Sequence, residues 1–451
     1  LNCPVKTPQA PDPGSGGVIV TRYNTFMTAF KYLPLLLLLA YGALILSQPS
    51  SQHADTPLGV NLAAGTGNPL PQFQSQLIGN DFSDFVHAPS IAETQDGNML
   101  MVCFSGSREG AGDVEIIGYQ FEAAAGDWHS LPSLAQRDQT ARDTGRHIRK
   151  LGNPVVARAP DGRLWLFYVS VSVGGWAGSA INARWSDNGG HSWSPASRLI
   201  NTPFFNISTL VKGTPLFMSD GTVMLPVYQE FLGKFSEVMH ISTTGEVQGK
   251  GRISAGRHSL QPVLLPLDTG TAALMRYAGD PPRRVLRADG QLSGPWSTPE
   301  KLQLPNPNAA ITALRRPAGD WLAVANNLEK GRYELSLLRS NDEGRSWQEI
   351  ATLESHDWGE EMWVPRDKFI PQLKSDAQRE ANWDMQNWEQ FQALAEKRLC
   401  DGERCKFMYD YPYMVQASDG DYHVVYTWNK SHIKHLAFNE AWVDQQLGAQ
   451  P

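Results

Sequence analysis

The amino-acid sequence repeats one short pattern six times, and this repetition constrains the fold more than any other feature. Each copy begins with a polar residue, which a proline usually follows. An apolar stretch, a turn centred on glycine and a second apolar stretch come next. An Asp-Gly or similar dipeptide supplies the positive φ that a tight turn between two strands requires. Each copy therefore predicts a β-hairpin. The copies start at His87, Asn153, Lys212, Gln261, Asn308 and Tyr411.

The spacing of the copies predicts one small sheet per copy. Successive copies start 66, 59, 49, 47 and 103 residues apart, and periods near 50 residues are typical of the four-stranded blades of β-propellers. We therefore predict an all-β fold, a six-bladed β-propeller over about residues 75–445. A pair of β-sandwich domains is the alternative, because evenly spaced hairpins also build that architecture.

The last interval is long because it holds an insertion before the final blade. Residues 375–399 carry large apolar side chains at helical spacing and almost no turn residues, so we predict a helical insertion at about residues 370–405. Cys400 and Cys405 are close enough to close a small disulfide loop in an oxidising compartment, and the sequence leaves that pairing open. Cys103 lies in an apolar run and is expected to be buried.

Two turns of a second kind lie between the predicted hairpins. Ser340–Trp347 has the pattern Ser-x-Asp-x-Gly-x-x-Trp, and Ser186–Trp193 has the same pattern with Asn188 at the Asp position. In such a turn the carboxylate or amide accepts backbone N–H groups, the glycine adopts positive φ, and the tryptophan fills the gap between adjoining sheets. These residues are therefore assigned a structural role.

Residues 1–54 are predicted to be a leader that precedes the fold. The apolar run at residues 32–46 is about fifteen residues long, follows Lys31, and comes shortly after Met27, a candidate start. This is the length of the apolar region of a signal peptide and is shorter than the roughly 20 residues of a membrane-spanning helix. We expect a secreted or periplasmic protein, with an uncleaved membrane anchor at residues 32–46 as the alternative.

A predicted site follows from the repeat, because the first strand of each propeller blade lines the central channel and the six starting positions converge at one mouth. The net charge of −7 and the lack of a long basic run argue against a nucleic-acid partner. The mixture of cations, carboxylates, amides and aromatic rings suits an acidic oligosaccharide or polysaccharide and requires no metal ion or cofactor. The predicted site residues are His87, Asn153, Lys212, Gln261, Asn308 and Tyr411 from the first strands, and Arg108, Asp113, Tyr168, Glu230, Arg276 and Trp428 from the second strands and the loops after them, with Glu109, Tyr228, Tyr277, Asn327 and Tyr426 at similar positions.

The hairpins, the two Ser-to-Trp turns and the run HAPSIAETQDGNMLMVCFSGSREGAGDV together resemble the exo-sialidase-like, BNR-repeat superfamily over about residues 85–440. The first-blade motif HxPS resembles a bacterial branch of it. The resemblance implies a glycoside hydrolase of exo-α-sialidase type. Asp113 would be the acid/base, Glu230 would activate Tyr411 as the nucleophile, and Arg276 would bind the substrate carboxylate.

The sequence departs from the sialidase pattern at the arginines that bind that carboxylate. His87 stands where sialidases have the first arginine, and the third arginine has no clear counterpart, although Asn308 stands near its place. His87 with Tyr411 or Tyr168 is also suited to a lyase for uronate-containing glycans, which removes a C5 proton and protonates the leaving oxygen. Asp113 and Glu230 favour hydrolysis, so a sialidase-like hydrolase is our first expectation. A non-catalytic glycan-binding propeller is the third reading.

Overall fold

The computed structural model describes residues 32–40, 69–79, 85–123, 125–200, 208–231, 233–253, 256–356, 358, 362–380, 382–383 and 385–449. The chain divides into two units, Leu1–Gln52 and His53–Pro451. In the first unit, residues 32–40 form a helix whose side chains are all exposed, and the rest of the predicted leader, with Met27, Lys31 and residues 41–54, lies outside the described residues. Among the helices that are described, none is long and apolar enough to cross a membrane.

The second unit is built mainly from antiparallel sheets of four or five strands, each made largely of consecutive strands. The first three sheets consist of β2 (Phe85–Glu93), β3 (Met99–Gly106), β4 (Glu115–Glu122) and β5 (Asp127–Ser130); β6 (Lys150–Arg158), β7 (Leu164–Val171), β8 (Ser179–Ser186) and β9 (Ser197–Arg198); and β10 (Leu210–Val211), β11 (Leu216–Phe217), β12 (Val223–Gln229), β13 (Phe235–Ile241) and β14 (Val247–Arg252). The next three consist of β15 (Ser259–Pro266), β16 (Thr271–Tyr277), β17 (Arg284–Gly290) and β18 (Glu300–Pro305); β19 (Thr312–Arg315), β20 (Trp321–Ala325), β21 (Leu335–Ser340) and β22 (Gln348–Glu354); and β26 (Tyr409–Gln416), β27 (Tyr422–Trp428), β28 (His432–Phe438) and β1 (Phe73–Ile78). The expectation of an all-β fold with four-stranded antiparallel sheets is confirmed.

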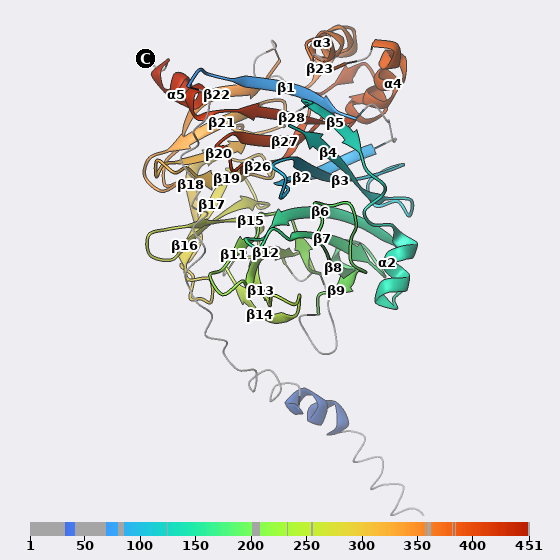
Figure 1. Ribbon diagram of the computed structural model, residues 1–451, viewed down its shortest axis with the longest axis vertical. Coiled ribbons are helices and arrows are strands. Elements are labelled where there is room, and N and C mark those ends of the chain that lie inside the picture. The colour runs from blue at the N-terminus through green and yellow to red at the C-terminus, as the bar shows by residue number, and fades with distance from the viewer. Residues whose placement is uncertain are drawn as a thin grey trace, which may run out of the picture. The chain divides into compact units, whose positions relative to one another are not determined.

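The last sheet combines the two ends of the second unit. Strand β1 pairs with β28 in antiparallel register, from Phe73 opposite Phe438 to Ile78 opposite Ile433, and the two strands run side by side in Figure 1. The edge that the last hairpin would leave unpaired is therefore covered by a strand from the beginning of the unit, which removes a site for edge-to-edge aggregation.

Neighbouring sheets contact one another in chain order, mostly through their first strands. Strand β2 contacts β6, β6 contacts β10, β12 contacts β15, β15 contacts β19, β19 contacts β26, and β26 contacts β2. Strands such as β7 are buried along their whole length, because adjoining sheets cover both of their faces, and a near-continuous apolar run is the sequence that such a strand needs. The starts of the six hairpin copies are thereby brought near one another.

The residues that open several copies have an unusual backbone. Asn153, Gln261, Asn308 and Tyr411 have φ between 42° and 61°, and Ala88, next to His87, has φ 51°. In four of the five cases a proline follows and the strand register shifts at that point, because proline cannot donate a hydrogen bond to the neighbouring strand. A side chain other than glycine in this region costs about 1–3 kcal/mol, and such strain is concentrated at functional sites.

The two Ser-to-Trp turns join the third and fourth strands of their sheets with matching hydrogen bonds. In the turn before β22, the Ser340 hydroxyl donates to Asp342 at 2.7 Å, and the indole N–H of Trp347 donates to the Gly344 carbonyl at 3.0 Å. Ser186, Asn188, Gly190 and Trp193 form the same bonds. Partial burial alone would raise the pKa of Asp342, but hydrogen bonds from Ser346 and Ser340 lower it to about 2. The polar groups of both turns are therefore used in holding the turn.

The insertion before the last sheet contains two helices, α3 (Arg366–Gln378) and α4 (Trp388–Leu399), and a small sheet of β23 (Val364–Pro365), β25 (Arg404–Cys405) and β24 (Cys400–Asp401). The sequence predicted a helical segment over residues 375–399, whereas α3 begins nine residues earlier and the helix is interrupted before α4. Cys400 and Cys405 form a disulfide, and Cys103 is a buried free thiol.

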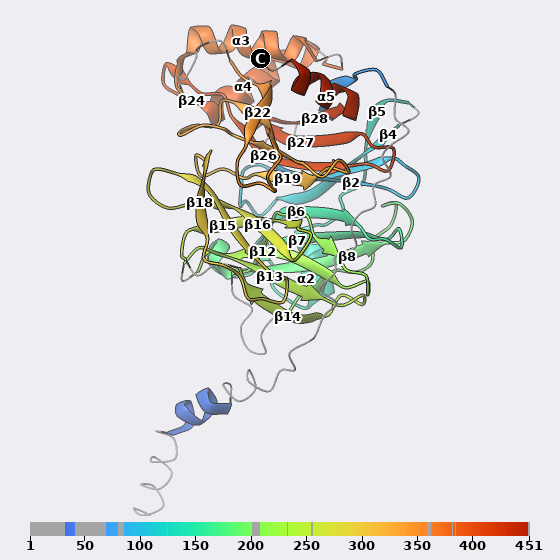
Figure 2. The ribbon, with the colours of Figure 1, turned by 90° about the vertical axis from the view of Figure 1, so that its left-hand side faces the viewer.

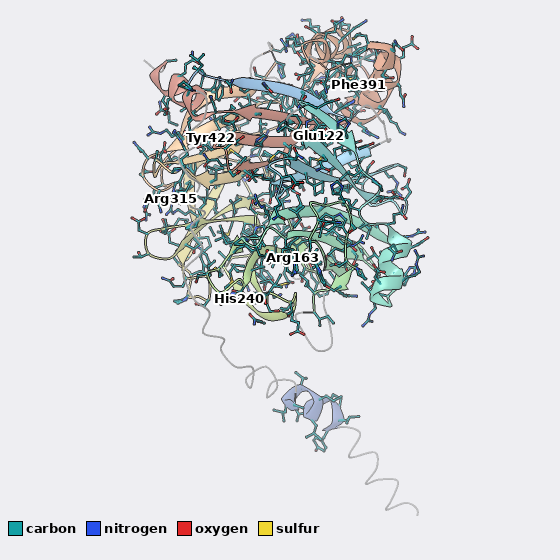
Figure 3. All side chains as sticks on the ribbon, viewed as in Figure 1. Glu122, Arg163, His240, Arg315, Phe391 and Tyr422 are labelled. Atoms are coloured by element: carbon teal, nitrogen blue, oxygen red, sulfur yellow. A yellow bond between two sulfur atoms is a disulfide. The ribbon has the colours of Figure 1, made fainter. Side chains whose placement is uncertain are left out.

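Phe391 on α4, labelled in Figure 3, stacks on Trp428 of β27 with ring centroids 5.7 Å apart. The insertion is thus part of the core of the last sheet. Two further helices, α2 (Arg137–Thr144) and α5 (Glu440–Gly448), were not predicted. In Figure 2, α2 lies at the opposite end of this unit from α3 and α4.

Candidate active site

Tyr411 lies at the centre of a hydrogen-bonded network that joins three sheets. The Gln261 amide donates to the Tyr411 hydroxyl at 3.2 Å, and Arg276 donates to the Gln261 carbonyl oxygen at 3.1 Å. The Nε of Arg276 also donates to Asn308 Oδ1 at 2.6 Å. Three of the residues with positive φ, Gln261, Asn308 and Tyr411, are therefore connected through one guanidinium, which is itself only half-buried.

Asp410 is the fully buried carboxylate beneath this network. Arg332 and Lys430 each form an ion pair with it at 2.5 Å, and Arg332 also donates to the Asn308 carbonyl at 2.7 Å. Burial alone would raise the pKa of Asp410, but Lys430 and Arg332 hold it well below its usual range. The side chains of Arg332 and Lys430 remain 19% and 16% exposed, so both cations are accessible at the site.

His87 lies against Tyr411 as a neutral imidazole. The two rings meet edge to face with centroids 4.4 Å apart. His87 Nδ1 lies 3.0 Å from the Thr427 hydroxyl, and Nε2 lies 3.5 Å from the Lys430 amine. Burial and the charge of Lys430 keep the pKa of His87 well below its usual value. The ring is therefore unprotonated at neutral pH and is a weak base, because burial and Lys430 disfavour its protonated form.

Lys212 is buried beside Tyr411 and Tyr413 of β26. Its amine donates to the carbonyls of Pro412 at 3.3 Å and Pro89 at 3.5 Å, and it lies 5.8 Å from the ring centroid of Tyr411 and 4.7 Å from that of Tyr413. Burial lowers the pKa of Lys212 to about 7. Protonated Lys212 adds a fourth cation to the surroundings of Tyr411.

The charges of both Tyr411 and Glu230 act on Tyr228. The Asn153 amide donates to the Tyr228 hydroxyl at 3.1 Å. Burial, followed by the charges of Tyr411 and Glu230, holds the pKa of Tyr228 well above its usual value. Among the described residues no carboxylate is hydrogen-bonded to the Tyr411 hydroxyl itself, and the direct Glu230–Tyr411 contact that the resemblance implies is not formed.

In the loop between β3 and β4, the charge of Glu109 acts on Arg332 of the cluster, whereas both oxygens of Asp113 are bound by Ser107. Both Asp113 oxygens accept hydrogen bonds from Ser107, one from the backbone N–H and one from the hydroxyl, each at 3.0 Å. Slight burial alone would raise the pKa of Asp113, but these bonds lower it. The lowered pKa disfavours a role of Asp113 as proton donor. Burial alone would lower the pKa of Arg332, but the charges of Asp410, Tyr411 and Glu109 raise it. Arg108 is exposed in the same loop.

Two of the residues predicted from the sequence lie outside this cluster because no part of their side chains is accessible. The Tyr168 hydroxyl is 2.9 Å from that of Thr140 on α2, in the core between the first two sheets. Trp428 is fully buried under Phe391. Neither side chain can contact a substrate. The others that meet at the cluster are His87, Asn153, Lys212, Glu230, Gln261, Arg276, Asn308 and Tyr411.

Sequence reasoning missed three charged residues of the cluster. Asp410 directly precedes Tyr411, Lys430 follows the end of β27, and Arg332 lies in the loop after β20. The first two adjoin positions that the repeat marks, so the repeat could have found them. Arg332 lies seven residues beyond the end of β20 and has no counterpart in the pattern.

A family model described as a BNR repeat-like domain matches residues 97–424, more than two thirds of the chain, and the chain belongs to this family. Among curated proteins, none matches its sequence. Its fold is similar to that of the Hadza microbial sialidase Hz136, at 15% identity and a TM-score of 0.57, covering 80% of this chain and 67% of that one.

Two further structures with a similar fold are a second sialidase and an arabinanase. The NanB sialidase from Streptococcus pneumoniae is 10% identical, with a TM-score of 0.53 and coverage of 83% of this chain and 71% of that one. The α-L-arabinanase of Penicillium chrysogenum, complexed with arabinobiose, is 12% identical, with a TM-score of 0.53 and coverage of 82% and 97%. At these identities the likeness establishes the fold, and the chemistry must be argued from the site.

Proposed function

We propose that this chain is a glycoside hydrolase of sialidase type that cleaves an acidic sugar at the centre of a six-bladed β-propeller. The observation that carries the proposal is the phenol of Tyr411 among four cations, Lys212, Arg276, Arg332 and Lys430. The contacts between neighbouring sheets in chain order, together with the pairing of β1 with β28, support the arrangement of the six sheets as blades.

The cations account for both binding and activation. Arg276 and Arg332 are partly exposed and present planar guanidinium groups, which pair well with a substrate carboxylate. The same cations offset the negative charge that develops on the Tyr411 oxygen as its proton leaves and the oxygen attacks. Glu230, whose charge acts on Tyr228 as that of Tyr411 does, accepts the Tyr411 proton.

The reaction then follows the two steps of a retaining glycosidase. The Tyr411 oxygen forms a bond to the anomeric carbon while the glycosidic C–O bond breaks, and the leaving oxygen takes a proton from Glu109. Water, activated by Glu109, next displaces Tyr411 and releases the sugar. Glu109 takes the role that the sequence gave to Asp113, because the oxygens of Asp113 are used by Ser107.

A uronate lyase is the second candidate function, and one observation favours it. Tyr411 has an amide, not a carboxylate, as its hydrogen-bond partner, and the neutral ring of His87 lies against it. In that reaction His87 or Tyr411 removes the C5 proton, a double bond forms between C4 and C5, and the C4–O bond breaks with protonation of the leaving oxygen.

Product masses distinguish the two reactions. The full chain is incubated with sialylated and uronate-containing oligosaccharides, and the products are analysed by mass spectrometry. Hydrolysis adds one water across the cleaved bond and elimination adds none. We expect products with the added water, and loss of at least about a thousandfold of the turnover in Tyr411→Phe. Tyr168→Phe, whose hydroxyl lies in the core, is the matched control and should retain turnover. No cleavage of any oligosaccharide would refute both functions.

We also propose that the chain is exported. The apolar run at residues 32–46 and the Cys400–Cys405 disulfide support this, because such bonds persist in oxidising compartments. Fractionation of cells that express the full chain tests it. Recovery of the protein in the cytoplasm with reduced cysteines would contradict export.

A further inference from the structure

The indole of Trp176 packs on the backbone of Gly152, beside the candidate active site. Trp176 belongs to a short turn, Trp176–Gly178, after β7. A Cβ on Gly152 would lie 2.7 Å from the indole Cη2, so only glycine allows this approach. Gly152 directly precedes Asn153, whose amide is bonded to Tyr228 in the site. Trp176 is therefore a neighbour of the catalytic cluster and is partly exposed.

Lys150 fills the space between this indole and the loop that carries Glu109. The Lys150 amine lies 3.9 Å from the ring centroid of Trp176, and a Cβ on Gly110 would lie 3.1 Å from it. The charge of Glu109 acts on both Lys150 and Arg332. Glu109 thus lies near both cations, and Trp176 with Lys150 is continuous with the site.

Positive charge is concentrated at this edge although the chain has a net charge of −7. Arg108 and Arg149 both act electrostatically on Lys150, and Arg149 donates to the carbonyl of Gly174 in the loop of Trp176 at 3.4 Å. Within the part of the chain that is described, Arg108, Arg149 and Lys150 form no ion pair. An aromatic ring beside cations that have no carboxylate partner among the described residues is suited to a sugar ring that bears a carboxylate.

We propose that Trp176, Lys150 and Arg149 form a second subsite, which binds a further acidic sugar unit next to the one that is cleaved. This rests on the proposed function, because that function sets where the cleaved bond lies. The indole stacks on the sugar ring while Lys150 and Arg149 pair with its carboxylate. The substrate is then a glycan with consecutive acidic sugars, not a single acidic sugar on a neutral chain.

Calorimetric titration of the full chain carrying Tyr411→Phe tests the subsite without turnover. The probes are monomers and tetramers of α-1,4-linked galacturonate, β-1,4-linked glucuronate and α-2,8-linked sialic acid. In at least one series we expect the tetramer to bind at least about tenfold more tightly than the monomer. Adding Trp176→Ala or Lys150→Met should remove most of that gain. The matched control is Lys374→Met on α3, whose amine lies 5.3 Å from the ring of Trp388, and it should keep the gain.

The outcomes separate the subsite from the catalytic proposal. If tetramers gain affinity through Trp176 and Lys150 but the wild-type chain does not cleave them, the subsite stands and the proposed function fails. If the wild-type chain cleaves but monomers and tetramers bind equally, the function stands and the subsite is refuted. Absence of binding in all three series, or a gain that Lys150→Met leaves unchanged, also refutes the subsite.

Discussion

Asp410 holds two cations of the candidate site in place, and its own charge has no access to water. Such a carboxylate stabilises the fold only while its partners are present, because a buried charge without a partner costs several kcal/mol. Arg332 and Lys430 come from different sheets, so the pairs with Asp410 also fix the distance between them.

Asp410→Asn should lower the free energy of unfolding by about 3 kcal/mol at pH 7. The pKa of Asp410 is lowered in the folded state, so its contribution is present above pH of about 4, the value for an unfolded aspartate, and is lost as the pH falls below it. The difference between wild type and variant should therefore narrow by about 1 kcal/mol at pH 3. Urea denaturation at both pH values measures this. Asp268→Asn, in an exposed ion pair, is the control, and an equal difference at both pH values would contradict the assignment.

Arg276→Lys should leave the fold intact and reduce kcat/KM by at least about a hundredfold. Its guanidinium bonds Asn308 and Gln261 at once, and a lysine amine cannot reproduce that fork. Steady-state kinetics with the cleaved oligosaccharide measure the loss, and a melting curve checks the fold. Arg315→Lys serves as the control, since Arg315, labelled in Figure 3, has an exposed partner. Unchanged kinetics in Arg276→Lys would remove this residue from the site.

The activity should fall as the pH rises through about 7, because burial lowers the pKa of Lys212 to about 7 and its charge is lost above that value. Without that charge, the site loses one of the cations that offset negative charge on Tyr411 during the reaction. A profile of kcat/KM between pH 5 and 9 should have this decline in the wild type. Lys212→Met should have a low kcat/KM that does not decline near pH 7. A decline at the same pH in the variant would assign the titration to another group.

At the scale of the element, the repeat predicted much of the site because a polar residue before a proline marks a strand bulge. Asn153, Gln261 and Tyr411 were found in this way. The ends of second strands were less informative, because a residue there faces either the site or the core. Trp428 faces the core since Phe391 covers it, and Phe391 belongs to an insertion far from it in the sequence. Packing of that kind leaves no local pattern in the chain.

The start of the inserted helix α3 was also set by tertiary packing that the sequence does not reveal. Its apolar spacing predicted a helix, but Pro371 lies inside α3, and a proline is normally a signal that a helix ends or has not begun. The helix is maintained by burial of Phe369 and Leu373 against the last two sheets. Tertiary packing therefore set the start of α3.

Phe391→Ala should lower the free energy of unfolding by about 3–5 kcal/mol, because the side chain is fully buried between Trp388, Trp428 and His432 and its removal leaves a cavity. Met385→Ala, in the exposed connection before α4, is the control and should change stability little. Denaturant unfolding of both variants measures the difference. Equal, small losses would mean that the insertion is an appendage instead of part of the core.

At the scale of the molecule, a ring of sheets would explain why residues from distant parts of the chain meet at one site. His87 and Lys430 are 343 residues apart in sequence and 3.5 Å apart at their nitrogens. Short hairpins are local and visible in the sequence, whereas the pairing that joins the two ends of the unit is not. The sequence placed the start of the fold at about residue 75 without assigning that segment a strand partner.

Removal of β1 tests the role of this pairing. A chain that starts at residue 69 retains every described strand and should melt at the temperature of the full chain. A chain that starts at residue 85 loses β1, so the edge of β28 is unpaired, Leu77 leaves the core beside the insertion, and the hydrogen bonds from Ser75 to Glu380 and from Asn382 to Leu77 are lost. We expect this shorter chain to melt at least about 10 °C lower or to aggregate, because an exposed strand edge pairs with other chains. Thermal melts and size-exclusion chromatography of the two chains measure this. Equal melting temperatures would mean that β1 does not close the last sheet in solution.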